Sequence, residues 1–125
     1  MKQDITEIEL NGVQYVRKDA IKSLAAAVNT DGLPCVIVAA GIGGIHFGFL
    51  KSKVGTEVVL TQARRIQYWN GAASISEMAI RGVSKPGDCR FSAAVPEITL
   101  TQAVEIIPVS TSAQANLSGV PIWTR

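Results

Sequence analysis

Short runs of apolar and β-branched residues, separated by glycines and polar turns, are the main pattern of this chain. Residues 35–40 (CVIVAA) are continuously apolar, which is typical of a buried strand. Alternating or β-branched segments predict five further strands, at residues 45–53, 56–60, 63–69, 96–100 and 103–109. Pro108 cannot donate a hydrogen bond to a neighbouring strand, so that end of the last strand should lie at a sheet edge.

Two short helices are predicted in the same region. Residues 74–77 read Ser-Ile-Ser-Glu, a pattern in which the serine and glutamate side chains cover unpaired backbone N–H groups at a helix start. Gly82 provides the stop, so a helix is predicted over 74–82. A second helix is predicted over 110–117, capped by Ser110 or Thr111, and the apolar tail after it is expected to dock on the domain.

Residues 1–31 predict an N-terminal arm that precedes a main β domain at 32–125. An Asn-Gly pair at positions 11 and 12 stands between two strand-like runs, which is the strongest short-range signal for a β-hairpin. Asp19 stands where a helix N-cap is expected, and helical spacing continues to Val28, where a polar turn follows. This arm is too small to bury its own apolar face, so it should pack on the main domain or on another subunit.

These elements predict an α+β fold that is mostly β. The strand–turn–strand segment from Gly48 to Ala63 resembles the first half of a small SH3-like or Sm-like barrel, where a glycine lets a long strand bend sharply. We therefore expect either such a barrel or a strongly bent antiparallel sheet, with one or two short helices. The turn after Lys53 lacks an aspartate and no Arg-Gly motif follows, so Sm-type RNA binding is not implied.

Composition narrows the class of protein further. The chain has 125 residues, of which 47% are hydrophobic, and its formal net charge is +2, too mild to indicate nucleic-acid binding by itself. Its apolar runs are far shorter than a bilayer span, and we expect neither a membrane segment nor a secretory leader. Cys35 and Cys89 are accordingly expected to be reduced thiols.

The sequence contains none of the familiar enzyme motifs. There is no nucleophile elbow, phosphate loop or zinc-binding spacing, and the lone His46 has no partners for a metal site. Residues 41–44 (GIGG) follow a predicted strand, but another strand comes next, whereas a dinucleotide fingerprint needs a helix start. We therefore expect a non-enzymatic protein without a cofactor or metal.

A second resemblance extends over most of the chain. The segments that carry it are residues 8–19, 44–48, 55–60, 63–72 and 95–108. Together they are similar to a family of small bacteriophage and prophage proteins of unknown function. The resemblance implies a phage origin and a setting in the host cytoplasm or the virion, and it implies no chemistry.

One cluster of side chains is the best candidate for a binding site. Its members are Arg64, Arg65, Tyr68, Trp69 and Asn70, joined by His46 from across the sheet. Arginine offers planar donors for phosphate, aromatic rings offer a stacking face for a base, and an amide can read a base edge. In a continuous strand Arg65 and Trp69 would share one face and Tyr68 would lie on the other.

The same cluster also has a purely structural interpretation. Tyr68 and Trp69 would then be core or subunit contacts, and Arg64 would pair with Glu57 or Glu105. Self-association is expected in either case, because the apolar face of the arm and the unpaired strand edges must be buried against something. Symmetric homo-oligomers are the usual way in which such surfaces are buried.

We interpret the chain as a non-enzymatic, homo-oligomeric phage protein that binds a phosphate-bearing ligand. In its most specific form it is a sponge that sequesters a nucleotide-type signal of host defence. One alternative is a structural virion component or a protein–protein interaction module. Another is a small-barrel RNA- or DNA-binding protein, whose affinity would fall steeply with salt.

Overall fold

The computed structural model describes residues 27–124, so the predicted hairpin and most of the predicted helix of the arm lie outside the described residues. Six strands form the sheet: β1 (Cys35–Ala39), β2 (Ile45–Val54), β3 (Glu57–Tyr68), β4 (Arg90–Phe91), β5 (Val95–Leu100) and β6 (Glu105–Pro108). The described part of the chain also contains two α-helices, α2 (Ile75–Arg81) and α3 (Thr111–Ser118), and two 3-10 turns, η1 (Gly41–Gly43) and η2 (Pro86–Asp88).

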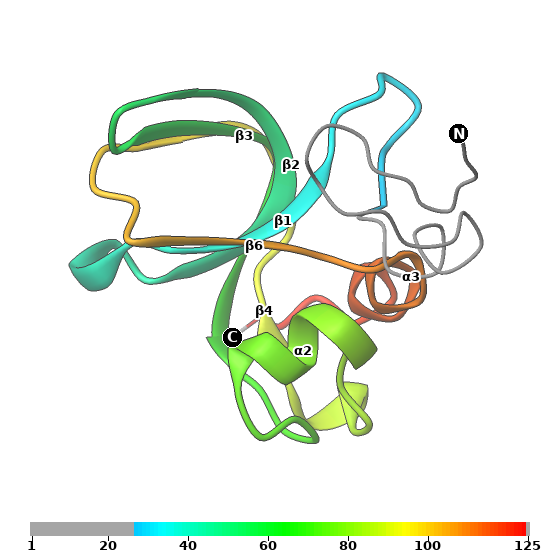
Figure 1. The fold of residues 1–125 in the computed structure, drawn as a ribbon. Helices are drawn as coiled ribbons and strands as arrows, with labels where there is room; N and C mark the ends of the chain where they lie inside the picture. The colour runs from blue at the N-terminus through cyan, green and yellow to red at the C-terminus, as the bar shows by residue number, and fades with distance from the viewer. Residues whose placement is uncertain (1–26, 125) are drawn as a thin grey trace, which may run out of the picture.

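All the strand pairs are antiparallel, in the order β4-β3-β2-β1-β6, and β5 pairs with the first part of β3. The long strands β2 and β3 arch over β1 and β6, so the sheet is strongly bent (Figure 1). The predicted mostly-β α+β class is confirmed, in the form of a bent sheet. No ladder among residues 27–124 joins β5 to β6, and the similarity to SH3-like barrels stays a prediction.

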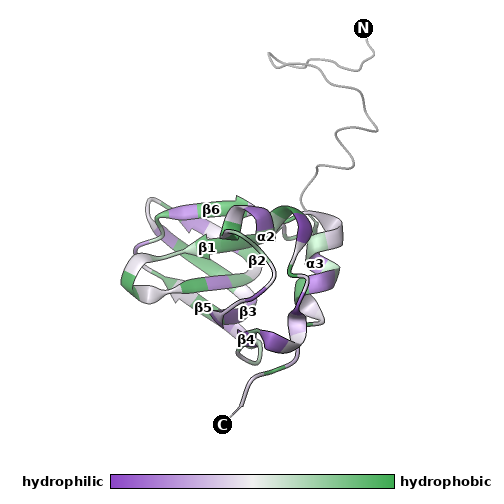
Figure 2. Ribbon diagram, turned by 90° about the horizontal axis from the view of Figure 1, so that it is seen from below, coloured by the Kyte–Doolittle hydropathy of each residue, from purple (hydrophilic) through white to green (hydrophobic). Residues whose placement is uncertain are grey.

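The bend gives the domain two separate apolar cores. The concave core lies inside the arch and includes Val38, Leu60 and Leu100 from β1, β3 and β5. The helix-side core lies on the opposite face, where α2 and α3 contribute Met78 and Leu117. Figure 2 shows hydrophobic residues along β1 and β2, next to the two helices. Both faces of the central strands are therefore buried, which explains the continuous apolar run of β1.

The helix-start signals of the sequence are confirmed. Ser74 Oγ accepts a hydrogen bond from the Glu77 N–H at 3.2 Å, and Gly82 ends α2 with a φ of 79°. The Glu77 carboxylate accepts from the N–H of Ala73, one residue before the expected one. Ser110 caps α3 and its hydroxyl also donates to the Ile80 carbonyl, which ties the start of α3 to the end of α2.

Some of the strand boundaries differ from those predicted. The segments at 56–60 and 63–69 are one continuous strand, β3, with a bulge at Gln62, whose φ is 50°. Gly48 lies opposite this bulge, and a Cβ there would come within 3.1 Å of the Ala63 Cα atom. The two-residue strand β4 escapes sequence analysis because it is too short to show alternation.

The two ends of the described chain also test the prediction. Val28 pairs with Pro34 in an isolated bridge, so the predicted helix is wrong at this residue. The tail docks as predicted, because Ile122 pairs with Phe91 and the Trp123 N–H donates to the Phe91 carbonyl at 2.9 Å. Among residues 27–124, neither helix has the length and apolar character needed to cross a bilayer.

Candidate functional site

The bulge in β3 decides which face each of the two consecutive arginines occupies. Leu60 and Ala63 both face the concave core, because Gln62 adds one residue to β3 between Thr61 and Arg64. Beyond the bulge, Arg64 lies opposite Phe47 on the helix side, and Arg65 lies opposite His46 on the concave side. The predicted approach of His46 to an arginine across the sheet is confirmed for Arg65.

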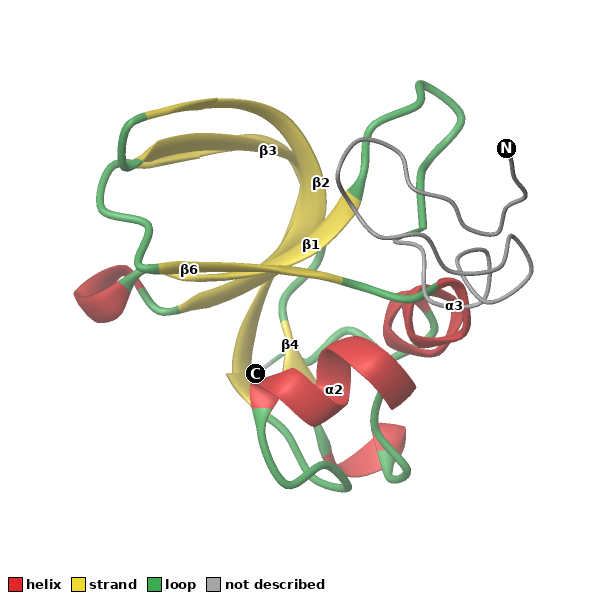
Figure 3. Cartoon of the chain, viewed as in Figure 1, coloured by secondary structure: helices red, strands yellow, loops and turns green. Residues whose placement is uncertain are grey.

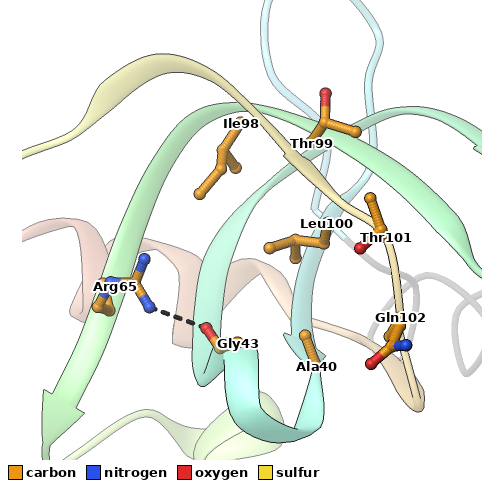
Figure 4. A pocket seen from close by; sticks show the side chains of 8 residues that line it. All are labelled: Ala40, Gly43, Arg65, Ile98, Thr99, Leu100, Thr101 and Gln102. Atoms are coloured by element: carbon orange, nitrogen blue, oxygen red, sulfur yellow. Dashed lines mark hydrogen bonds between the residues drawn. The ribbon is translucent and has the colours of Figure 1, made fainter.

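Arg65 stands at the rim of a hollow in the concave side of the molecule (Figure 4). Its side chain is exposed, and Nη1 donates to the Gly43 carbonyl at 2.8 Å. The hollow has a volume of about 240 Å³ and is lined by Ala40, Gly43, Arg65, Ile98, Thr99, Leu100, Thr101 and Gln102. It therefore combines the Arg65 cation with the Thr101 hydroxyl and the Gln102 amide over an apolar floor.

His46 lies beside Arg65 but is buried. Its Nε2 is 2.8 Å from the Gly43 carbonyl, which can only accept, so this nitrogen carries the proton. Burial lowers the pKa of His46 below 6.5, the hydrogen bond to Gly43 opposes this shift, and the nearby charge of Arg65 adds to it. One carbonyl thus holds both side chains, and the imidazole stays neutral beside the guanidinium at neutral pH.

Arg64 does not belong to the same site. It is 6% exposed, its Nε donates to Ser92 O at 2.7 Å, and its Nη1 donates to Leu117 O at 3.1 Å. The guanidinium carbon lies 5.2 Å from the centre of the Phe91 ring. The expected pairing with Glu57 or Glu105 is absent: the only ion pairs between described residues are Lys51–Glu97 and Arg81–Glu77. Burial lowers the pKa of Arg64.

The predicted aromatic and amide members of the cluster are spread out. Trp69 packs against the helix-side core and its Nε1 donates to Ala72 O, so the predicted shared face with Arg65 is wrong. The reason is that β3 ends at Tyr68, after which the alternation of faces no longer applies. Asn70 is part-buried, and its backbone N–H donates to Cys89 Sγ at 3.3 Å.

Tyr68 is 49% exposed and belongs to a surface cluster that sequence analysis missed. The Arg90 guanidinium carbon lies 5.7 Å from the centre of the Tyr68 ring and 5.1 Å from that of Trp123. Tyr68 and Arg90 are paired across β3 and β4, and the tail brings Trp123 to them. No local signal predicts this arrangement, because its three residues come from distant segments.

The cysteines behave as buried core residues. Burial raises the pKa of Cys35 to about 12, so this thiol is neutral and unreactive near neutral pH. The Cys89 thiol lies 3.4 Å from the Lys85 carbonyl, and both thiols are free. Within residues 27–124 no three His, Cys, Asp or Glu side chains gather in a group that could hold a metal ion.

Fold and site together define a small domain with a bent antiparallel sheet, two helices on one face and a cationic hollow on the other. Residues 33–117 match a domain of unknown function, DUF6948, and the chain belongs to this family. The match covers all six strands and both helices except the last residue of α3. No curated protein and no solved structure matches the chain.

Proposed function

We propose that this domain is a non-enzymatic binding protein that holds a phosphate-bearing ligand at the hollow beside Arg65. The observation that supports this most directly is the state of Arg65. Its guanidinium is exposed, is held by a backbone carbonyl, and has no carboxylate partner among the described residues. An arginine fixed in this way keeps donors free for a phosphate and loses little side-chain entropy on binding.

The lining of the hollow is suited to the rest of such a ligand. Thr101 and Gln102 offer hydrogen-bond donors and acceptors near the cation, and Ile98 with Leu100 offers an apolar floor. The volume of about 240 Å³ is smaller than the roughly 300–1,000 Å³ of most small-molecule sites. One protomer therefore encloses only part of a nucleotide, and the aromatic stacking partner comes from elsewhere.

Self-association would complete the site. Three connections lie at the end of the sheet away from α2 and α3: η1, the β2–β3 turn and the β5–β6 loop (Figure 3). Ile42, Val54 and Val104 belong to or adjoin these connections. Ile42 is fully exposed and the two valines are 75% and 72% exposed. Backbone hydrogen bonds from Ala103 to Thr56 and from Val104 to Ala39 hold these loops together beside the hollow. We infer that a second copy covers this apolar end and closes the ligand site.

A sponge for a nucleotide-type defence signal is the most specific form of the proposal. Such a protein acts by holding its ligand, so it needs affinity and copy number and performs no reaction. The resemblance to small phage proteins supports only the setting of this proposal, in the host cytoplasm or the virion. Cyclic oligonucleotides and ADP-ribose derivatives are the ligands to test first, since each combines phosphate with a flat base.

Isothermal titration calorimetry tests the site with inorganic phosphate, cyclic dinucleotides, cyclic trinucleotides and ADP-ribose. Arg65→Ala should weaken binding by at least about tenfold, because a charge-assisted hydrogen bond is lost. Arg81→Ala removes the same charge from the exposed face of α2 and should leave the affinity unchanged. Absence of heat from all four probes, or equal affinity of wild type and Arg65→Ala, contradicts the proposal.

Light scattering after size exclusion tests the assembly, combined with nucleotide analysis of a heat-released extract of the protein as purified from cells. An oligomer that releases a nucleotide supports the sponge. An oligomer with nothing bound favours the alternative, in which the exposed apolar loops are contacts of a structural virion component or interaction module.

A further inference from the structure

The buried guanidinium of Arg64 has unused hydrogen-bonding capacity on the helix side of the sheet. Two of its five N–H groups are occupied, by the carbonyls of Ser92 and Leu117. Its Nη2 atom is buried and has no hydrogen-bond partner among the described residues. Buried donors are almost always paired in folded proteins, and a buried cation is normally neutralised by an anion. Among residues 27–124, the Nη2 atom of Arg64 therefore lacks a hydrogen-bond partner and the guanidinium lacks a counter-ion.

A cavity adjoins this side chain. It has a volume of about 420 Å³ and is lined by Arg64, Ala94, Ser118, Val120, Pro121 and Ile122. This volume is within the range of about 300–1,000 Å³ that is usual for small-molecule sites. The cavity shares no lining residue with the hollow beside Arg65, which lies on the opposite face of β3. It is therefore a second and independent place for a ligand.

The lining selects the chemistry of that ligand. A guanidinium edge matches the two oxygens of a carboxylate, and Ser118 can contribute a hydroxyl. The other four lining residues are apolar, so the body of the ligand should be apolar too. A phosphate dianion fits less well, because a single cation leaves one of its charges uncompensated against apolar walls. The geometry points to a site for a small monocarboxylate with an aromatic or branched aliphatic body.

Nuclear magnetic resonance on the wild-type chain tests this site without disturbing Arg64. Benzoate is the probe, benzyl alcohol is the uncharged control with the same ring, and inorganic phosphate is the control anion. The readouts are the side-chain Nε–H of Arg64 and the backbone amides of Ala94, Ser118 and Ile122. Benzoate should shift these signals saturably, and benzyl alcohol should bind at least about tenfold more weakly.

A matched pair of variants supplies the second arm. Ile122→Glu places a carboxylate at the cavity, and because this side chain is 57% exposed the fold should tolerate it. Benzoate should then bind at least about tenfold more weakly, since the new carboxylate competes for Arg64. Ile80→Glu makes the same change at an equally exposed isoleucine on α2, which does not line the cavity, and should leave benzoate binding as in the wild type.

Three results overturn the inference: no saturable shift with benzoate, equal binding of benzyl alcohol, or undiminished binding by Ile122→Glu. Phosphate-bearing ligands at Arg65 should instead shift the amides of Gly43, His46 and Thr101. The failure of one site is therefore distinguishable from the failure of the other.

Discussion

Arg64 and Arg65 are adjacent in the sequence and carry the same side chain, yet they lie in opposite environments. Arg64 is 6% exposed and joins β3 to the Ser92 segment and to the end of α3. Arg65 is exposed and its one hydrogen bond to Gly43 fixes it at the rim of the concave hollow. The helix side of β3 thus uses arginine to stabilise the fold, and the concave side presents arginine to solvent.

This difference depends on the register of β3 against β2. With regular alternation from Leu60, Arg64 would face the concave core and Arg65 the helices. The extra residue at Gln62 reverses that assignment. A single bulge therefore determines which arginine is buried on the helix side and which one is exposed at the concave hollow, and the following variants test each side of the comparison.

The largest effect is expected at Arg64. Arg64→Ala leaves the part-buried carbonyl of Ser92 without its side-chain donor, takes one donor from the buried Leu117 carbonyl and opens a gap under β3, so the free energy of unfolding should fall by about 3 kcal/mol or more. Arg65→Ala should change it by less than about 0.5 kcal/mol, because the side chain is exposed. Urea denaturation of both variants measures the difference, and equal destabilisation would contradict the assignment of the two faces.

The bulge itself is tested at Gly48. A Cβ at this position would lie 3.1 Å from both the Ala63 Cα and the Thr61 carbonyl, which are backbone atoms and cannot move aside easily. Gly48→Val should therefore lower the free energy of unfolding by about 2 kcal/mol and should weaken ligand binding at Arg65. Gly87→Ala is the control, since nothing lies within 4 Å of its Cβ position. A stable Gly48→Val variant with unchanged binding would mean that the close approach is unimportant.

On the helix side, the loss of stability at alkaline pH tests whether the Cys35 thiol is buried. Burial raises the pKa of this thiol from its ordinary value of 9.0 to about 12, so the native state keeps the proton to a higher pH than the unfolded chain does. Stability is therefore lost as the pH rises above 9.0. Between about pH 8 and about pH 10.5 the wild type should lose about 2 kcal/mol more than Cys35→Ala. Chemical denaturation at both pH values measures this, and parallel losses would show that the thiol is not buried.

The smallest effect is expected on the concave side, at His46. Its pKa is lowered in the fold, so the unfolded chain binds the proton first and stability should fall as the pH drops below 6.5. His46→Gln retains a side-chain donor for the Gly43 carbonyl but does not titrate there. Thermal melts from neutral to acidic pH should show a shallower decline for the variant than for the wild type. Identical slopes would argue against a desolvated imidazole beside Arg65.

The candidate site was only partly predictable. The cross-strand approach of His46 to Arg65 follows from two adjacent strands, whereas Ile98 and Leu100 of β5, and Thr101 and Gln102 just after it, line the hollow because β5 pairs with β3, and that pairing has no local signal. The sequence pattern puts Trp69 on the wrong face because it extends the strand one residue beyond Tyr68, where β3 ends. The partner groups of Arg64 come from residues 92 and 117, at separations that no periodicity describes.

The sequence by itself determined those elements whose causes are local. The apolar run of β1, the serine caps of α2 and α3, the glycine stop at Gly82 and the edge position of Pro108 each depend on a few neighbouring residues. Tertiary structure alone decided the bulge at Gln62, the two-residue strand β4 and the faces of the two arginines. These depend on how distant strands align, and the energy that sets their alignment comes from burying both faces of one bent sheet at once.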